Sequence, residues 1–263
     1  MKKVQKALLV LLRAGLWESR IEDLSCFPMS AGEWKNLYLL SRQQTVTGIV
    51  FQGIQHLPEH FLPAEELLVR WMAETDAIER KNIQMNKALE LLVQWFTESG
   101  VQPVLQKGQG IASLYENPLL RECGDIDFYF DSRQMFEKAF SLIRQCGLRE
   151  KVQADQSVTY AWKGVEVEHH TCLLDLHNPF LQRYAKELEQ QYGYNHMRLE
   201  GGLDVRIPSP VLNLLLQSLH ILKHALGWGI GLRQLCDMAR SCYKLHDEVE
   251  SEEMKKIVLK LGM

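Results

Sequence analysis

The feature that most constrains this chain is a pair of aspartates, one residue apart, in an apolar run that is predicted to be a strand over residues 125–130. Residues two apart on a β-strand point to the same face of a sheet. Asp125 and Asp127 should therefore project together, while the apolar residues between and after them project into a core. Two carboxylates held side by side repel each other and need a cation or a shared proton. The pattern predicts a metal site on one face of the sheet.

The segments around this strand alternate in type and indicate a compact α/β unit. A short apolar run over 101–105 is predicted to be a strand, and Gly108 opens a turn into a short helix over 109–115. The elements that follow are a helix over 132–146, a strand over 148–152, and a hairpin of strands over 158–162 and 165–170. Residues 101–177 therefore read β-α-β-α-β-β-β.

The last of these strands repeats the two-faced arrangement. Its valines share one face, and its polar side chains share the other: Glu166, Glu168 and His170. If this strand and the Asp125–Asp127 strand are neighbours in one sheet, their carboxylates gather in one place. A third ligand is then expected among these carboxylates, and Glu168 is one candidate. Glu166, on the same face, and Asp175, in the repeated acid-x-His pattern Asp175-Leu176-His177, are the alternatives.

Helical patterns flank this unit on both sides. Ser30 and Glu33 form a capping box for a helix through Leu40. Residues 64–99 predict one long helix or two joined ones, ended by Gly100. Further helices are predicted over 179–192, 211–226, 232–245 and 252–261, with a short strand over 203–207. The predicted fold class is α+β, with a helical N-terminal region at 1–99, a small mixed-sheet core at 100–178 and a helical C-terminal region at 179–263.

Composition argues against several kinds of partner. The chain has 263 residues and a formal net charge of −3, so no global basic field favours nucleic acid or an anionic membrane. Its six cysteines include no CxxC pair, which is typical of reduced thiols in a cytoplasm. Arg13 interrupts the N-terminal apolar run Ala7–Leu12, so we expect an amphipathic helix rather than a signal peptide. No run approaches the ~20 apolar residues of a membrane span, and we expect a cytoplasmic protein.

With these residues placed, the chain resembles the nucleotidyltransferase superfamily that shares the polymerase-beta-type fold. The signature of that superfamily is a strand, a glycine turn opening a helix, a Dx[DE] strand and a later third acidic residue. Gly108 stands at the turn, Asp125 and Asp127 fill the pair, and Glu168 fits the third position. More narrowly, the chain resembles a bacterial group described as uncharacterised nucleotidyltransferases. The residues that carry this resemblance are Leu105-Gln106-Lys107-Gly108, Tyr115, Arg121, Gly124-Asp125-Ile126-Asp127, Glu168-His169-His170, and downstream His220, His224, Arg233 and Asp237.

The resemblance implies transfer of an NMP from an NTP to a hydroxyl acceptor, with release of pyrophosphate. It assigns Asp125, Asp127 and Glu168 to Mg²⁺ or Mn²⁺. It assigns the nucleotide phosphates to four residues around the turn and before the carboxylate strand: Lys107, Gly108, Gln109 and Arg121. The implied acceptor is a small-molecule hydroxyl or a protein side chain rather than a nucleic acid. One departure concerns the turn, where the superfamily usually carries Ser and this chain carries Gln109.

Other interpretations remain open for several of these residues. The departure at Gln109 is compatible with a catalytically inactive module that binds nucleotides or a partner protein. Lys107 is either a phosphate contact or a surface lysine, and Arg121 either contacts phosphate or pairs with a nearby carboxylate. A zinc hydrolase built on the 168–177 histidines, with Cys172 and Asp175, is a further alternative. The histidine pair on the predicted 211–226 helix is expected to line a core or cleft, although one-turn spacing allows a shared metal.

Overall fold

The computed structural model describes residues 2–176, 178–227 and 229–262. The chain forms two compact units. The first unit consists of Met1–Ile83, Ala112–Cys123 and Ile230–Asp237, and the second of Gln84–Ile111, Gly124–Gly229 and Met238–Met263. Helices α4 (Glu65–Glu98) and α9 (Leu232–Leu245) each have residues in both units. In the described part of the chain, no helix has both the length and the apolar character needed to cross a membrane.

The first unit is helical. It contains α1 (Lys3–Trp17), α2 (Ala31–Gln43), α3 (Thr47–Ile54), the 3-10 helices η1 (Glu59–Phe61) and η2 (Pro118–Leu120), and the start of α4. The predicted capping box of α2 is confirmed, because the Glu33 amide donates to Ser30 Oγ at 3.3 Å and the Ser30 amide donates to Glu33 Oε2 at 2.7 Å. Helices α1 and α3 pack backbone to backbone, since a Cβ at Gly53 would lie 1.9 Å from the Leu11 carbonyl oxygen.

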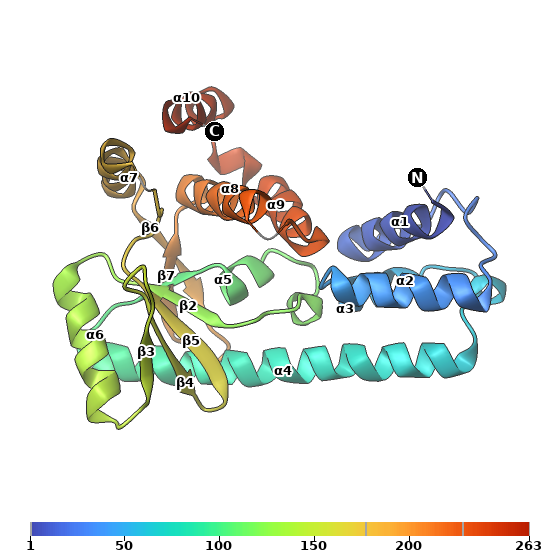
Figure 1. The fold of residues 1–263 in the computed structure, drawn as a ribbon, viewed down its shortest axis with the longest axis horizontal. Helices are drawn as coiled ribbons and strands as arrows, with labels where there is room; N and C mark the ends of the chain where they lie inside the picture. Colours follow the sequence, from blue (N-terminus) through green and yellow to red (C-terminus); the bar gives the residue numbers. More distant parts are fainter. Residues whose placement is uncertain (1, 177, 228, 263) are drawn as a thin grey trace. The chain divides into compact units, whose positions relative to one another are not determined.

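The second unit is built on a seven-stranded mixed sheet (Figure 1), with the strand order β3-β4-β5-β2-β1-β7-β6. The strands are β1 (Val104–Gln106), β2 (Ile126–Tyr129), β3 (Glu150–Val152), β4 (Val158–Trp162), β5 (Val165–His170), β6 (Tyr194–Arg198) and β7 (Asp204–Pro208). Strand β2 lies between β1, which runs antiparallel to it, and β5, which runs parallel to it. The carboxylate strand is therefore in the interior of the sheet.

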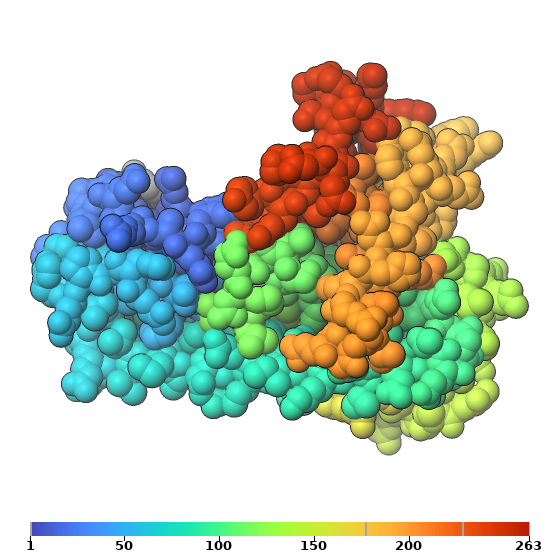
Figure 2. Space-filling model, turned by 180° about the vertical axis from the view of Figure 1, so that it is seen from behind, coloured from blue at the N-terminus to red at the C-terminus, as the bar shows by residue number. Residues whose placement is uncertain are grey.

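Aromatic side chains and one histidine fill the core on one face of the sheet. Phe128 and the following Phe130 meet Phe96 of α4, with ring centroids 6.0 and 6.1 Å apart. His169 of β5 lies among them, fully buried, and its Nε2 is 2.9 Å from the Tyr160 hydroxyl. Helices α4 and α6 (Arg133–Gln145) lie on this side of the sheet (Figure 1). The exposed side of α4 is visible as a row of teal spheres in Figure 2.

The opposite face carries the carboxylates and an apolar cluster. Val104 and Tyr129 pack there with leucines of α7 (Pro179–Tyr192) and α8 (Pro210–Leu226) and with Ile257 of α10 (Ser251–Leu261). Asp127 and Tyr129 point to this face together, because they are two apart on β2. Helices thus flank both faces of the sheet, and the carboxylates sit beside one of the two cores.

The predicted α+β fold class is confirmed, and the segment predicted as one or two helices over 64–99 forms the single helix α4 (Glu65–Glu98). Strand β1 begins three residues later than predicted, at Val104, because Pro103 has no amide hydrogen to donate. Helix α5 (Gly108–Ala112) ends earlier than predicted, where the chain passes into the first unit. The hairpin at 158–170 is present, with positive φ at Lys163 and Gly164.

The predicted strand over 203–207 is β7, but its partner β6 was not predicted. Strand β6 has the sequence Tyr-Asn-His-Met-Arg, lies at the edge of the sheet and has no fully buried residue. An edge strand without a buried face lacks the apolar alternation by which a strand is recognised. The sheet therefore includes two strands from beyond residue 178, in the region that was predicted to be mainly helical.

Candidate functional site

The parallel pairing of β2 and β5 brings the predicted carboxylates together. Asp127 lies in register with Glu168, and Tyr129 lies in register with His170. Since residues in register on adjacent strands project to the same face, Asp127, Glu168 and His170 share one surface. The sequence predicted that the carboxylates gather if these two strands are neighbours in one sheet, and β2 and β5 are neighbours.

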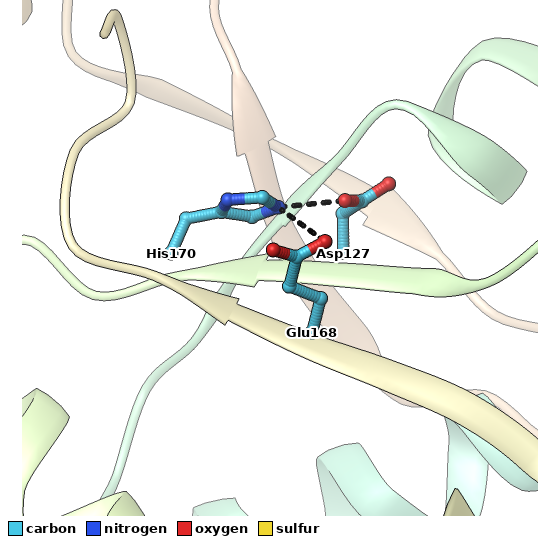
Figure 3. A group of neighbouring side chains, drawn as sticks. All are labelled: Asp127, Glu168 and His170. Atoms are coloured by element: carbon cyan, nitrogen blue, oxygen red, sulfur yellow. Dashed lines mark hydrogen bonds and ion pairs between the residues drawn. The ribbon is translucent and has the colours of Figure 1, made fainter. Parts of the chain in front are cut away.

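Asp127, Glu168 and His170 form the centre of the site (Figure 3). His170 Nε2 is 2.7 Å from Asp127 Oδ1 and 3.8 Å from Glu168 Oε2. Each residue offers one donor atom, and the three atoms lie within 4.8 Å of one another. Two carboxylate oxygens and an imidazole nitrogen in this arrangement can hold a metal ion.

Lys107 supplies a positive charge at the same carboxylate. Its Nζ lies 3.2 Å from Asp127 Oδ1. Lys107 and Gly108 both adopt positive φ values, 36° and 44°, and so form the tight turn between β1 and α5. This conformation is unfavourable for a lysine and natural for a glycine. The turn thus directs the ammonium group to the carboxylate strand.

The charges around Asp127 decide its ionisation. Burial would raise the pKa of Asp127, but the Lys107 ammonium and the hydrogen bond with His170 outweigh burial and hold that pKa below its usual range. Burial would lower the pKa of Lys107, but Asp127 and the other nearby carboxylates raise it above its usual value. Carboxylate and ammonium are therefore both charged near neutral pH.

Asp125 lies one residue before β2 and is partly buried. Burial, together with the negative charges of Asp127, Glu168 and Glu166, raises its pKa. Asp125 is therefore electrostatically coupled to the site. It is not among the three donors that lie within 4.8 Å of one another in the described residues. Its role as a metal ligand stays a prediction.

Glu168 is held by a neighbour that the sequence did not single out. Ser157, directly before β4, is buried, and its Oγ donates a hydrogen bond of 2.7 Å to Glu168 Oε1. Thr159 lies in register with Glu168 on β4. His170 was placed on the carboxylate face by the strand alternation, and it was considered as a ligand only in the zinc alternative. The two-residue spacing between Glu168 and His170 was the sequence signal that both side chains share a face. The position of Ser157 depends on the register of the β4–β5 hairpin, for which the sequence offers no such signal.

The alternatives to Glu168 lie outside this group of three. Glu166 shares the face but is exposed. Asp175 follows the strand and pairs with Lys223 at 3.4 Å, both side chains being well exposed. His177 lies outside the described residues. Cys172 is partly exposed, and its carbonyl oxygen accepts a hydrogen bond from Gln106.

The predicted phosphate-binding residues separate into two sets. Lys107, Gly108 and Gln109 belong to the second unit, with the carboxylates. Gln109 is buried, and neither its Oε1 nor its Nε2 has a hydrogen-bond partner among the described residues. Arg121 belongs to the first unit, where its Nε and Nη2 donate to the two carboxylate oxygens of Asp237, each at 2.7 Å. This is the carboxylate pairing that the sequence left open for Arg121.

The other downstream residues are also placed. His220 and His224 lie one turn apart on α8, partly buried, with ring centroids 4.4 Å apart. Arg233 donates through Nη1 to the carbonyl oxygen of Glu122 at 2.7 Å. Asp237, four residues after Arg233 on α9, is buried and binds Arg121.

The second unit thus brings together two carboxylates and an imidazole on adjacent strands and an ammonium group from the turn after β1. Carboxylates and imidazoles are groups with which proteins bind divalent metals. The chain belongs to the family described as uncharacterised nucleotidyltransferases, whose model matches residues 30–263. No curated protein and no solved structure matches the chain. Membership of this family supports a transferase of the nucleotidyl type.

Proposed function

We propose that this chain is a nucleotidyltransferase dependent on Mg²⁺ or Mn²⁺, which moves an NMP from an NTP to a hydroxyl acceptor and releases pyrophosphate. The observation that carries the proposal is the parallel register of Asp127 with Glu168 in a chain of this family. The resemblance to the polymerase-beta-type superfamily assigns these two residues, with Asp125, to the metal site. The donors suit such an ion, because Mg²⁺ and Mn²⁺ prefer hard oxygen ligands.

The reaction exchanges a phosphoanhydride bond for a phosphoester bond. The acceptor oxygen bonds to the α-phosphorus, the bond to the bridging oxygen of the β-phosphate breaks, and pyrophosphate carries that electron pair away. The proton of the acceptor hydroxyl passes to a base, for which Glu168 is the candidate. Ser157 holds the Oε1 atom of Glu168 and so orients its carboxylate. A divalent cation, when bound, would neutralise the negative charge that builds on the acceptor oxygen and on the leaving pyrophosphate oxygen.

The turn after β1 is the proposed binding site for the nucleotide phosphates. Lys107 brings an ammonium group to the carboxylates, and its side chain keeps 18% of its surface exposed. Gln109 is buried, and its amide has no hydrogen-bond partner in the described part of the chain, an arrangement that costs roughly 1–3 kcal/mol for each unsatisfied group. A bound nucleotide that hydrogen-bonds to this amide would remove that cost. Arg121 is already engaged by Asp237, so we assign no phosphate contact to it.

The acceptor is proposed to be a small-molecule or protein hydroxyl. A formal net charge of −3 gives no general attraction for nucleic acid. The described structure contains six free cysteines, which fits the reducing conditions of a cytoplasm. We therefore propose a cytoplasmic enzyme.

One observation favours a second candidate, a nucleotide-binding module without turnover. The Asp127 carboxylate already has two partners, the Lys107 ammonium at 3.2 Å and the His170 imidazole at 2.7 Å. A carboxylate neutralised in this way persists without a metal. Together with Gln109 in place of Ser at the turn, this arrangement is compatible with binding that does not lead to transfer.

The test is incubation of the protein with each labelled NTP and Mg²⁺ or Mn²⁺, followed by measurement of pyrophosphate and of intact protein mass. Asp127→Asn and Glu168→Gln should abolish pyrophosphate release, while Glu187→Gln, at an exposed position on α7, should not. Loss of activity in Glu166→Gln but not in Glu168→Gln would reassign the third carboxylate. Thermal stabilisation by an NTP without pyrophosphate release supports the binding module. No thermal shift with any NTP contradicts both candidates.

A further inference from the structure

His170 is the one member of the central group that offers nitrogen rather than oxygen. Its Nε2 lies 2.7 Å from Asp127 Oδ1 and 3.8 Å from Glu168 Oε2. The position is built by the sheet, since β5 places His170 two residues after Glu168 on the same face and in register with Tyr129 of β2. The His170 side chain keeps 19% of its surface exposed, so an ion can reach it from solvent.

On the basis of the proposed metal-dependent transfer, we infer that His170 is a metal ligand together with Asp127 and Glu168, and that it makes the site select Mn²⁺ over Mg²⁺. The three donors that lie together are then one nitrogen and two oxygens. Carboxylates alone are compatible with both Mg²⁺ and Mn²⁺, and His170 as a ligand would favour Mn²⁺.

The chemical reason lies in the different ligand preferences of the two ions. Mg²⁺ gives up its water reluctantly and is bound through oxygen. Carboxylates suit both Mg²⁺ and Mn²⁺, whereas imidazole suits first-row transition metals such as Zn²⁺, Fe²⁺ and Ni²⁺. Mn²⁺ stands at the weak-binding end of that series, and as a transition metal it accepts an imidazole more readily than Mg²⁺ does. A site of three carboxylates would discriminate little between these ions. Replacing one carboxylate by an imidazole should therefore favour Mn²⁺.

The geometry allows a competing role for His170. Its Nε2 could remain protonated and only donate a hydrogen bond that orients Asp127. In that case a side chain that keeps an N–H donor at the same reach should preserve the affinity for both ions. His170→Gln supplies such a donor, whereas His170→Ala supplies none. The two variants therefore separate a ligand from a positioning residue.

The experiment measures Mn²⁺ and Mg²⁺ binding to the full chain by titration calorimetry, with electron paramagnetic resonance of bound Mn²⁺ as a second readout. We expect His170→Ala and His170→Gln each to lose about tenfold or more of the Mn²⁺ affinity. The Mg²⁺ affinity should change much less, so the Mn²⁺ to Mg²⁺ ratio falls. Glu168→Gln should instead weaken both ions, and His224→Ala should leave the ratio unchanged, which excludes the histidine pair on α8 as the source.

Three results overturn the inference. They are an unchanged ratio in His170→Ala, full retention of Mn²⁺ affinity in His170→Gln, and absence of divalent-ion binding by the unmodified protein. Failure of the proposed transfer is a separate outcome, because calorimetry needs no NTP and no acceptor. If pyrophosphate release proceeds while the ratio does not depend on His170, the transferase proposal stands and the histidine assignment fails.

Discussion

The guanidinium of Arg121 binds both carboxylate oxygens of Asp237, with Nε–Oδ1 and Nη2–Oδ2 distances of 2.7 Å. Both side chains are buried in the first unit, and the Tyr115 hydroxyl donates to the same Oδ1 at 2.6 Å. Removing one member of a buried ion pair leaves an uncompensated charge, which costs about 3–5 kcal/mol. We expect Asp237→Leu to lower the free energy of unfolding by this amount, as measured by urea denaturation.

The remaining variants of this network test whether charge pairing is the cause. The double variant Arg121→Met/Asp237→Leu should recover much of the lost stability, because no unpaired charge remains. Tyr115→Phe should cost about 1.5 kcal/mol, for one hydrogen bond to a charged group. Arg133→Ala, which breaks the exposed pair with Glu137, should cost about 0.5 kcal/mol or less. A double variant as unstable as Asp237→Leu would contradict this account.

The turn between β1 and α5 should not tolerate a side chain at Gly108. Gly108 has φ of 44°, and a Cβ there would lie 3.3 Å from the Asp125 carbonyl oxygen. Gly108→Ala should therefore cost about 1–2 kcal/mol, measured as a lower midpoint of thermal unfolding. Gly124→Ala is the matched control, because a Cβ at Gly124 has no neighbour within 4 Å. Equal effects of the two substitutions would show that the backbone at Gly108 is not constrained.

Ser157 should support the affinity of the metal site through Glu168. Its Oγ donates to Glu168 Oε1 at 2.7 Å, and Ser157→Ala removes this restraint on the carboxylate. Loss of such a supporting hydrogen bond lowers metal affinity by about tenfold. Calorimetric titration with Mn²⁺ measures the effect. Thr159→Val is the control on the same strand, since the Thr159 hydroxyl interacts with Lys151 and Gln153 rather than with Glu168.

Cys236 should be inert in the folded protein. Burial, followed by the charge of Asp237, raises the pKa of its thiol to about 12. A raised pKa keeps the thiol protonated, and the thiolate is the reactive form. Iodoacetamide at pH 9 should therefore alkylate exposed Cys146 and leave buried Cys236 unmodified, as followed by peptide mass. Modification of Cys236 at the rate of Cys146, without denaturant, would be the opposite result.

The carboxylate strand shows why part of the site was predictable. Alternation along a strand is a local property with a period of two residues, so Asp127 could be assigned a face opposite Phe128 from the sequence alone. The same rule placed Glu168 and His170 on one face of β5, and the structure has them there. The capping box of Ser30 and Glu33 was equally predictable, because its partners are three residues apart.

Partners that are distant in the chain could not be predicted in this way. Asp237 lies 116 residues from Arg121, and only the folded first unit brings the two together. Strand β6 has no buried face to recognise, and it acquires its structure by pairing with β7. The hydroxyl of Ser157 meets Glu168 because of the register of the β4–β5 hairpin, which the alternation of either strand does not specify.

Local patterns thus sufficed for the α+β class, the helical character of the α4 segment, the hairpin at 158–170 and the face on which each candidate carboxylate lies. The tertiary structure decided that β2 and β5 are parallel neighbours, and that Asp127 therefore meets both Glu168 and His170, 43 residues further along. It also decided that Arg121 belongs to a buried pair with Asp237. The physical reason is that backbone periodicity acts over a few residues, whereas strand order, register and the pairing of buried charges depend on the path of the whole chain.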